Sequence, residues 1–144
     1  MKTYFTAQRN VQIVISLLKQ NGIKRVVTSP GMTDVAINIS LQHDPYFELY
    51  SCVDERSAAY MACGMAAETG EPVAITCTGA TASRNYMPAM TEAYYRHLPI
   101  LAITCSQPSG RIGHYMDQVT GRTLLPRDVA NVSVTAKLIN SVED

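Results

Sequence analysis

Short apolar strand patterns alternate with helical segments along this sequence, and that alternation limits the possible folds more than any other feature. The strand patterns lie at residues 24–29, 47–53, 72–78 and 99–105, and none of them has a polar face. Strands that are apolar throughout and alternate with helices are typical of a parallel sheet that is buried on both sides. We therefore predict a three-layer α/β/α fold with a mostly parallel central sheet.

Helical periodicity predicts helices in the segments between these strands. The predicted helices cover residues 11–21, 33–42, 55–70 and 84–97. Glycine commonly follows the last residue of a helix, so Gly22 and Gly70 mark the ends of the first and third helices. Thr33 or Asp34 lies near the N-cap of the second helix. Residues 79–83 are predicted to form the turn that precedes the fourth helix.

The C-terminal part of the chain is less regular. Residues 107–129 are rich in Gly, Pro and Arg, and they are predicted to form a surface excursion or a lid. Residues 130–139 are expected to add an edge strand to the sheet. We find no repeat and no internal linker in the 144 residues, so residues 1–144 are predicted to form one domain.

Charge and hydropathy argue against several partners. Twelve basic and twelve acidic residues give a net charge of zero without a run of either sign, which disfavours nucleic acid and anionic membranes. No apolar run approaches the roughly 20 residues that cross a bilayer, and the N-terminus is unlike a signal peptide, so the cytoplasm is the expected location. Only 17% of residues are charged, against an average of about 25%, which suggests that some surface contacts another subunit or domain.

The four cysteines are spaced too widely for a common metal or redox motif. They are Cys52, Cys63, Cys77 and Cys105. No C-x-x-C pair occurs, so we predict free thiols and no metal site within this chain.

Three turns at the ends of predicted strands carry unusual residues. They are "SPGMT" at residues 29–33, "VDERS" at 53–57 and "CTGATASRN" at 77–85. Ligands of open α/β sheets bind outside the carboxyl ends of the strands, where these turns would lie. Each can also be a tight turn with a helix cap, and the residues alone leave that alternative open. None contains G-x-G-x-x-G or G-K-[ST], which disfavours a phosphate-binding loop.

These motifs resemble, in order and spacing, the N-terminal pyrimidine-binding domain of thiamine diphosphate-dependent enzymes. That superfamily includes acetohydroxyacid synthase and pyruvate decarboxylase. The "DERSAA" box and the T-G-A-T-A-x-x-N-Y-x-P-A pattern are most similar to the menaquinone-pathway succinyl-cyclohexene-carboxylate synthases. The resemblance covers about residues 8–136. It outweighs an unrelated flavodoxin-like binding domain, which would place phosphate or flavin contacts at "SPGMT".

The resemblance implies a catalytic role for Glu55. In the family, the matching glutamate hydrogen-bonds the ring nitrogen N1′ of the cofactor's aminopyrimidine and favours the imino tautomer that activates the thiazolium carbon. The cofactor-binding residues that the resemblance implies are Pro30, Gly31, Glu55, Thr78, Gly79, Ala80 and Asn85. Gln118 and His114 match a segment that reaches the substrate side, although either can also be a solvated loop residue.

The resemblance also implies partners. The cofactor would be thiamine diphosphate, with magnesium held by a diphosphate-binding domain or subunit whose G-D-G motif this sequence lacks. The chain is therefore expected to be inactive alone, as a subunit of a split enzyme or a piece of a longer polypeptide. A homodimer is expected, because the small residues of the third helix would allow close approach of a second subunit, although they can equally pack on the sheet.

One departure from the family concerns the substrate. The menaquinone enzymes have Ser-Arg after S-P-G, whereas this chain has Met32-Thr33. We therefore expect decarboxylation or carboligation of a different small 2-oxoacid, by a lyase or a transferase. The alternative is a non-catalytic oligomerisation or regulatory module of the same fold with a decayed cofactor site.

Overall fold

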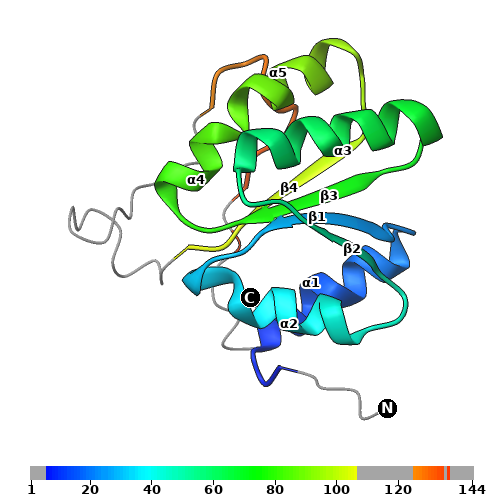
Figure 1. Cartoon of the computed structure of the whole chain (residues 1–144), viewed down its shortest axis with the longest axis vertical. Helices are drawn as coiled ribbons and strands as arrows, with labels where there is room; N and C mark the ends of the chain where they lie inside the picture. The colour runs from blue at the N-terminus through cyan, green and yellow to red at the C-terminus, as the bar shows by residue number, and fades with distance from the viewer. Residues whose placement is uncertain (1–5, 107–124, 135, 137–144) are drawn as a thin grey trace.

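Four parallel strands form the centre of a computed structural model that describes residues 6–106, 125–134 and 136. The strands are β1 (Arg25–Ser29), β2 (Glu48–Ser51), β3 (Val73–Cys77) and β4 (Ile100–Thr104). They lie in the order β2-β1-β3-β4, and each hydrogen-bonded pair is parallel (Figure 1). The predicted parallel sheet is therefore confirmed.

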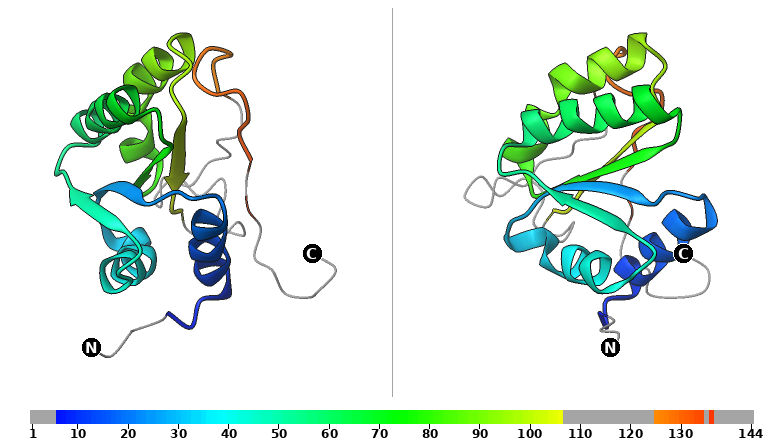
Figure 2. Two further views of the ribbon diagram at one scale, coloured as in Figure 1. Left: turned by 90° about the vertical axis from the view of Figure 1, so that its right-hand side faces the viewer. Right: turned by 45° about the vertical axis from the view of Figure 1, so that its right-hand side comes forward.

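Helices cover both faces of this sheet. They are α1 (Arg9–Gln20), the 3₁₀ turn η1 (Met32–Asp34), α2 (Val35–His43), α3 (Glu55–Thr69), α4 (Ala80–Asn85) and α5 (Met87–Tyr95). Helices α1 and α2 lie on one face, and α3, α4 and α5 lie on the other (Figures 1 and 2). The three predicted layers are confirmed.

Successive strand residues supply the two cores on opposite faces of the sheet. Val26 packs in the core with α1 and α2, whereas the next residue, Val27, packs in the core with α3. On α3, four buried alanines face the sheet: Ala58, Ala59, Ala62 and Ala66. Their small side chains let α3 lie close to the strands, which supports the alternative that they pack on the sheet. Gly64 and Ala67 are exposed.

The ends of α1 and α3 follow the predicted glycine signals. Gly70 adopts φ +69° and donates its N–H to the Ala66 carbonyl, so it ends α3 in the left-handed conformation that glycine favours. Gly22 has φ +71° just after α1. Both predicted helix ends are confirmed.

The segment predicted as a turn followed by one helix contains two helices instead. Helix α4 already begins at Ala80, and α5 begins at Met87, with Pro88 in its first turn. Proline has no backbone N–H and its ring clashes with the carbonyl four residues earlier, so Pro88 separates α5 from α4. The turn predicted at residues 79–83 is therefore wrong beyond Gly79.

The predicted C-terminal edge strand is wrong where the structure describes it. Residues 130–134 form no strand, and Val132 and Val134 are exposed, because an alternating pattern becomes a strand only where it pairs with a sheet edge. Residues 107–124 lie outside the described part of the chain. Residues 125–129 form no helix or strand, and Pro126 and Arg127 are exposed, as expected for a surface segment. Val129 anchors this segment in the core with α3, and the Tyr95 hydroxyl donates to Asp128 Oδ2 at 3.3 Å.

All four cysteines lie in the described residues and are free thiols, as expected. The helices of the described residues are all too short or too polar to cross a bilayer.

Candidate functional site at the carboxyl edge of the sheet

The parallel arrangement brings three of the predicted turns to one edge of the sheet. Because β1 lies between β2 and β3, the segment after β1 is flanked by the segments that follow its two neighbours. After β1 the chain continues into α2 on one face, and after β3 it continues into α4 on the other (Figure 2). The chain therefore diverges between β1 and β3, which is where open α/β sheets bind ligands.

Gly31 and Thr78 are in close contact at this point of divergence. A Cβ atom on Gly31 would lie 2.4 Å from Thr78 Cγ2, closer than side chains tolerate. The backbone of Gly31 is extended, with φ −158°, so its close approach to Thr78, and not its torsion angles, requires glycine. Two residues assigned to the cofactor by resemblance thus come together across 47 positions of sequence.

Glu55 and Asn85 form a second contact at this edge. Glu55 is the first residue of α3 and is half-buried, and Asn85 is the last residue of α4. Asn85 Nδ2 donates to Glu55 Oε2 at 3.1 Å. Within the described residues, Oε2 accepts this bond and Oε1 has no hydrogen-bond donor, so Oε1 can accept from a ligand.

Asp54 carries out the capping role that would otherwise fall to Glu55. Its Oδ2 accepts from the Ser57 backbone N–H at 2.8 Å and from the Ser57 hydroxyl at 2.7 Å. These bonds lower the pKa of Asp54, the side-chain bond first and the backbone bond second. Asp54 therefore caps the N-terminus of α3, so the Glu55 side chain is not needed as a cap and can face the edge of the sheet.

The other predicted site residues differ in how much of their surface is exposed. Pro30 is exposed, Gly79 is the N-cap of α4, and the Ala80 side chain is buried, so Ala80 can contribute only its backbone to a ligand. His114 and Gln118 lie outside the described residues. The place of these two residues in the site therefore stays a prediction.

Two side chains next to this edge were not assigned to the site from the sequence. Met32 is 88% exposed in η1, directly after Gly31. Asp34 is fully buried, and its Oδ1 accepts from the Gly31 N–H at 2.7 Å. An acidic residue three positions after the start of a helical turn is the available signal for such a bond, because it is half of a capping box.

The cysteines near this edge are poor nucleophiles. Burial, the largest cause, raises the pKa of Cys77 to about 11 and that of Cys105 to about 12. Both thiols are protonated at neutral pH, whereas the thiolate is the reactive form. Among the described residues, no three histidine, cysteine or acidic side chains form a group that could hold a metal ion.

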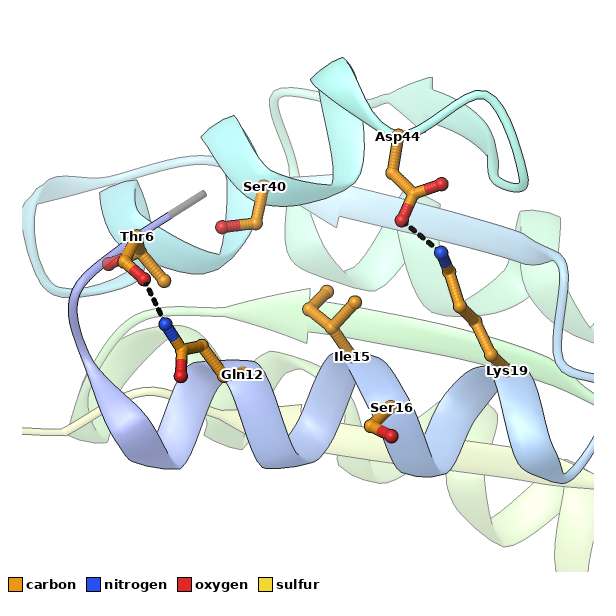
Figure 3. Close-up of a pocket in the computed structure, with 7 residues that line it drawn as sticks. All are labelled: Thr6, Gln12, Ile15, Ser16, Lys19, Ser40 and Asp44. Carbon is orange, nitrogen blue, oxygen red and sulfur yellow. Dashed lines mark hydrogen bonds and ion pairs between the residues drawn. The ribbon is translucent and has the colours of Figure 1, made fainter. Parts of the chain in front are cut away.

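A separate pocket of about 330 Å³ lies between α1 and α2 (Figure 3). Its lining residues are Thr6, Gln12, Ile15, Ser16, Lys19, Ser40 and Asp44. Several of its polar groups bond to one another or to their own helix: Lys19 pairs with Asp44, and the Ser40 hydroxyl donates to the Ala36 carbonyl at 2.7 Å. It contains none of the residues predicted to be functional, so the carboxyl edge of the sheet is the better candidate site.

The fold is an α/β domain in which three turns lie at one carboxyl edge of a parallel sheet, with the Gly31–Thr78 and Glu55–Asn85 contacts there. Residues 9–124 match the family model described as "Thiamine pyrophosphate enzyme, N-terminal TPP binding domain". Because the match covers most of the chain, the protein belongs to this family, and the resemblance found in the sequence is confirmed.

Similar proteins agree with this assignment. The 2-succinyl-5-enolpyruvyl-6-hydroxy-3-cyclohexene-1-carboxylate synthases of Porphyromonas gingivalis and Bacteroides thetaiotaomicron are each 36% identical, over 86% and 96% of this chain. The chain spans only 21% and 24% of their lengths. The thiamine diphosphate-dependent 4-hydroxybenzoylformate decarboxylase of Rhodococcus jostii shares the fold, with a TM-score of 0.69, 23% identity, and coverage of 77% of this chain and 21% of its own.

The Gly31 contact predicts a specific steric coupling. Gly31→Ala is expected to destabilise the chain by about 1–3 kcal/mol, because the new methyl group meets the β-branched and therefore stiff Thr78 side chain. Thr78→Ser removes Cγ2, so the double variant should recover much of that loss. Urea unfolding of the four proteins measures the coupling, and strictly additive effects would contradict the contact.

The Asp54 cap predicts a contribution to stability that depends on pH. A carboxyl group whose pKa is lowered by folding stabilises fully above its unfolded pKa of about 3.9, and this contribution is lost as pH falls through the lower folded pKa. Asp54→Ser keeps a capping oxygen without this titration. The urea midpoint of the unmodified chain should therefore fall more steeply below about pH 4 than that of Asp54→Ser. Parallel pH curves would show that the cap does not act through its charge.

Proposed function

We propose that this chain supplies the pyrimidine-binding half of a thiamine diphosphate-dependent enzyme that decarboxylates or carboligates a 2-oxoacid, with Glu55 as its catalytic residue. The observation that carries the proposal is the Asn85–Glu55 hydrogen bond at the carboxyl edge of the sheet. It joins two motifs that lie 30 positions apart and that match the family independently. The names of the relatives, which are synthases and decarboxylases, support this class of reaction.

The residues at this edge fit the pyrimidine portion of the cofactor. Thiamine diphosphate, when bound, supplies a carbanion-stabilising thiazolium ring. Glu55 would hold and release a proton at the pyrimidine ring nitrogen N1′, while the Asn85 amide fixes the orientation of its carboxylate. Gly31 and Thr78 would form one wall beside the ring, with Pro30, Gly79 and the Ala80 backbone next to them.

The remaining parts of the site would come from a partner. A diphosphate-binding domain or subunit would hold the diphosphate and magnesium, and a homodimer would place that domain against this one. Residues 1–144 would then act as one pyrimidine-binding domain. Gln118 and His114 are proposed to face the substrate. Met32, exposed beside Gly31, stands where the menaquinone enzymes have a serine, which favours a substrate other than theirs.

The alternative function is a non-catalytic module with a decayed cofactor site. A module of that kind would not need an oriented carboxylate, because Asp54 already caps α3. The Asn85–Glu55 pair therefore favours the enzyme, and the two functions differ in what they predict for Glu55.

Replacing Glu55 by glutamine tests the catalytic role. The amide has nearly the same size but cannot exchange a proton, so activity of the complete enzyme should fall by about 100-fold to 10,000-fold. Exchange of the thiazolium C2 proton with solvent, followed by NMR, should slow in parallel, while cofactor affinity changes only modestly.

Glu68→Gln is the matched control, because Glu68 is exposed near the other end of the same helix. It should leave both activity and proton exchange unchanged. Unchanged C2 exchange in Glu55→Gln would exclude cofactor activation by Glu55 and favour the non-catalytic module.

Self-association is a second expected outcome. The exposed apolar side chains Val35, Ile39, Tyr60 and Met61 leave apolar surface on α2 and α3. We expect this 144-residue chain to dimerise at micromolar concentration, which sedimentation velocity can measure. A monomer throughout that range would indicate that the apolar surface contacts only the diphosphate-binding partner.

A further inference from the structure

Three contacts hold the turn that follows β1, and all of them involve residues far from Glu55 in the sequence. Gly31 packs on Thr78 after β3. The Thr33 hydroxyl donates to the Cys105 carbonyl at 2.6 Å, just after β4. The Gly31 N–H donates to Asp34 Oδ1 at 2.7 Å. The first two contacts connect the turn to the segments that follow β3 and β4, and the third fixes the shape of the turn itself.

The burial of Asp34 costs more free energy than a purely local hydrogen bond requires. It has no exposed surface, and its Oδ2 is buried without a hydrogen-bond partner in the described part of the chain. Burying a polar oxygen without a partner costs free energy that an exposed side chain avoids. Asp54 makes the same kind of bond to a backbone N–H at the surface, so capping alone does not require burial.

The Asp34 side chain acts on the turn before it and does not cap α2. Asp34 occupies the N-cap position of α2, yet its side chain makes no capping bond to that helix. It accepts instead from the Gly31 N–H, three residues earlier. The carboxylate therefore stabilises the turn at the carboxyl edge of the sheet and leaves the first turn of α2 without a side-chain cap.

We propose that Asp34 is a positioning residue that holds Gly31 against Thr78 and so builds the wall on which the pyrimidine ring of thiamine diphosphate rests. This inference rests on the proposed function, since it names the same cofactor. Without the Asp34 acceptor, the Gly31 N–H has no partner in the turn. The turn can then move away from Thr78, so Asp34 acts on the cofactor only through Gly31.

Three variants separate this role from a structural one. Asp34→Leu is nearly isosteric but removes both oxygens, and it replaces a buried polar group by an apolar one, which proteins often tolerate well. Asp34→Asn keeps an acceptor at Oδ1. Asp44→Leu is the control, because Asp44 is also buried and accepts a backbone N–H, that of Tyr46 at 3.1 Å, but lies at the other end of α2.

Three measurements apply to each variant. Titration calorimetry of the complete enzyme with thiamine diphosphate and Mg²⁺ gives the cofactor's dissociation constant. Amide hydrogen exchange of Gly31, followed by NMR in this 144-residue chain, reports the hydrogen bond directly and does not depend on activity. Thermal unfolding shows how much stability each variant has lost.

Asp34→Leu should weaken cofactor binding by about 10-fold to 100-fold, as expected when a backbone donor loses its hydrogen-bond acceptor, and should speed Gly31 exchange. Asp34→Asn should restore both to near the unmodified values. Asp44→Leu should lower thermal stability without changing either. If Asp34→Leu does not fold, Asp34→Ala makes the same test.

Equal cofactor affinity in Asp34→Leu and the unmodified enzyme would overturn the inference and leave the proposed function standing. Loss of affinity in Asp34→Asn as large as in Asp34→Leu would overturn it as well, because the acceptor is retained there. If the unmodified enzyme does not bind thiamine diphosphate, the proposed function fails and this inference fails with it.

Discussion

The pairing of β1 with both β2 and β3 is the constraint on which the rest of this structure depends. In register, Val26 pairs with Leu49 on one side and with Ala74 on the other, and all three strands run in the same direction. Parallel strands need crossover connections, so α2 and α3 must return across the sheet, on opposite faces here. The same pairing places Gly31 next to Thr78 and puts Glu55 at the same edge. The location of the site therefore follows from the strand order, before any side-chain chemistry is considered.

Two neighbouring carboxylates, Asp54 and Glu55, have different roles at the start of α3. A helix N-terminus has unpaired N–H groups and attracts negative charge, so a single acidic residue there would be drawn into capping. Asp54 bonds the Ser57 N–H and hydroxyl, and Glu55 instead meets Asn85 from α4. The sequence "VDERS" therefore contains one structural and one candidate catalytic carboxylate, which composition alone could not distinguish.

Local signals predicted the parts of this chain that are determined locally. The apolar runs gave the four strands, and Gly70, with its left-handed backbone, gave the end of α3. Helix α4 was missed because the Gly, Thr and Ser of "GATAS" also favour turns, and only packing on α3 and the sheet decides between a turn and a helix. Residues 130–134 have the alternation of a strand but pair with no edge, and pairing is a tertiary property. The Gly31–Thr78 contact was equally invisible, although the family resemblance had named both residues.

Polar side chains at the carboxyl half of the sheet connect the fold to the site. Thr76 donates to Thr28 at 2.9 Å, and Thr28 donates to Asn38 of α2 at 2.8 Å, in an otherwise apolar layer. Buried polar groups that bond to one another tolerate little displacement, because each lost bond leaves an unpaired group. This chain of bonds fixes α2 on β1 and β3. Since η1 leads directly into α2, it also fixes where the turn at Gly31 begins its approach to Thr78. The buried polar residues of this sheet therefore lie near its carboxyl edge, where they help to fix the position of the candidate site.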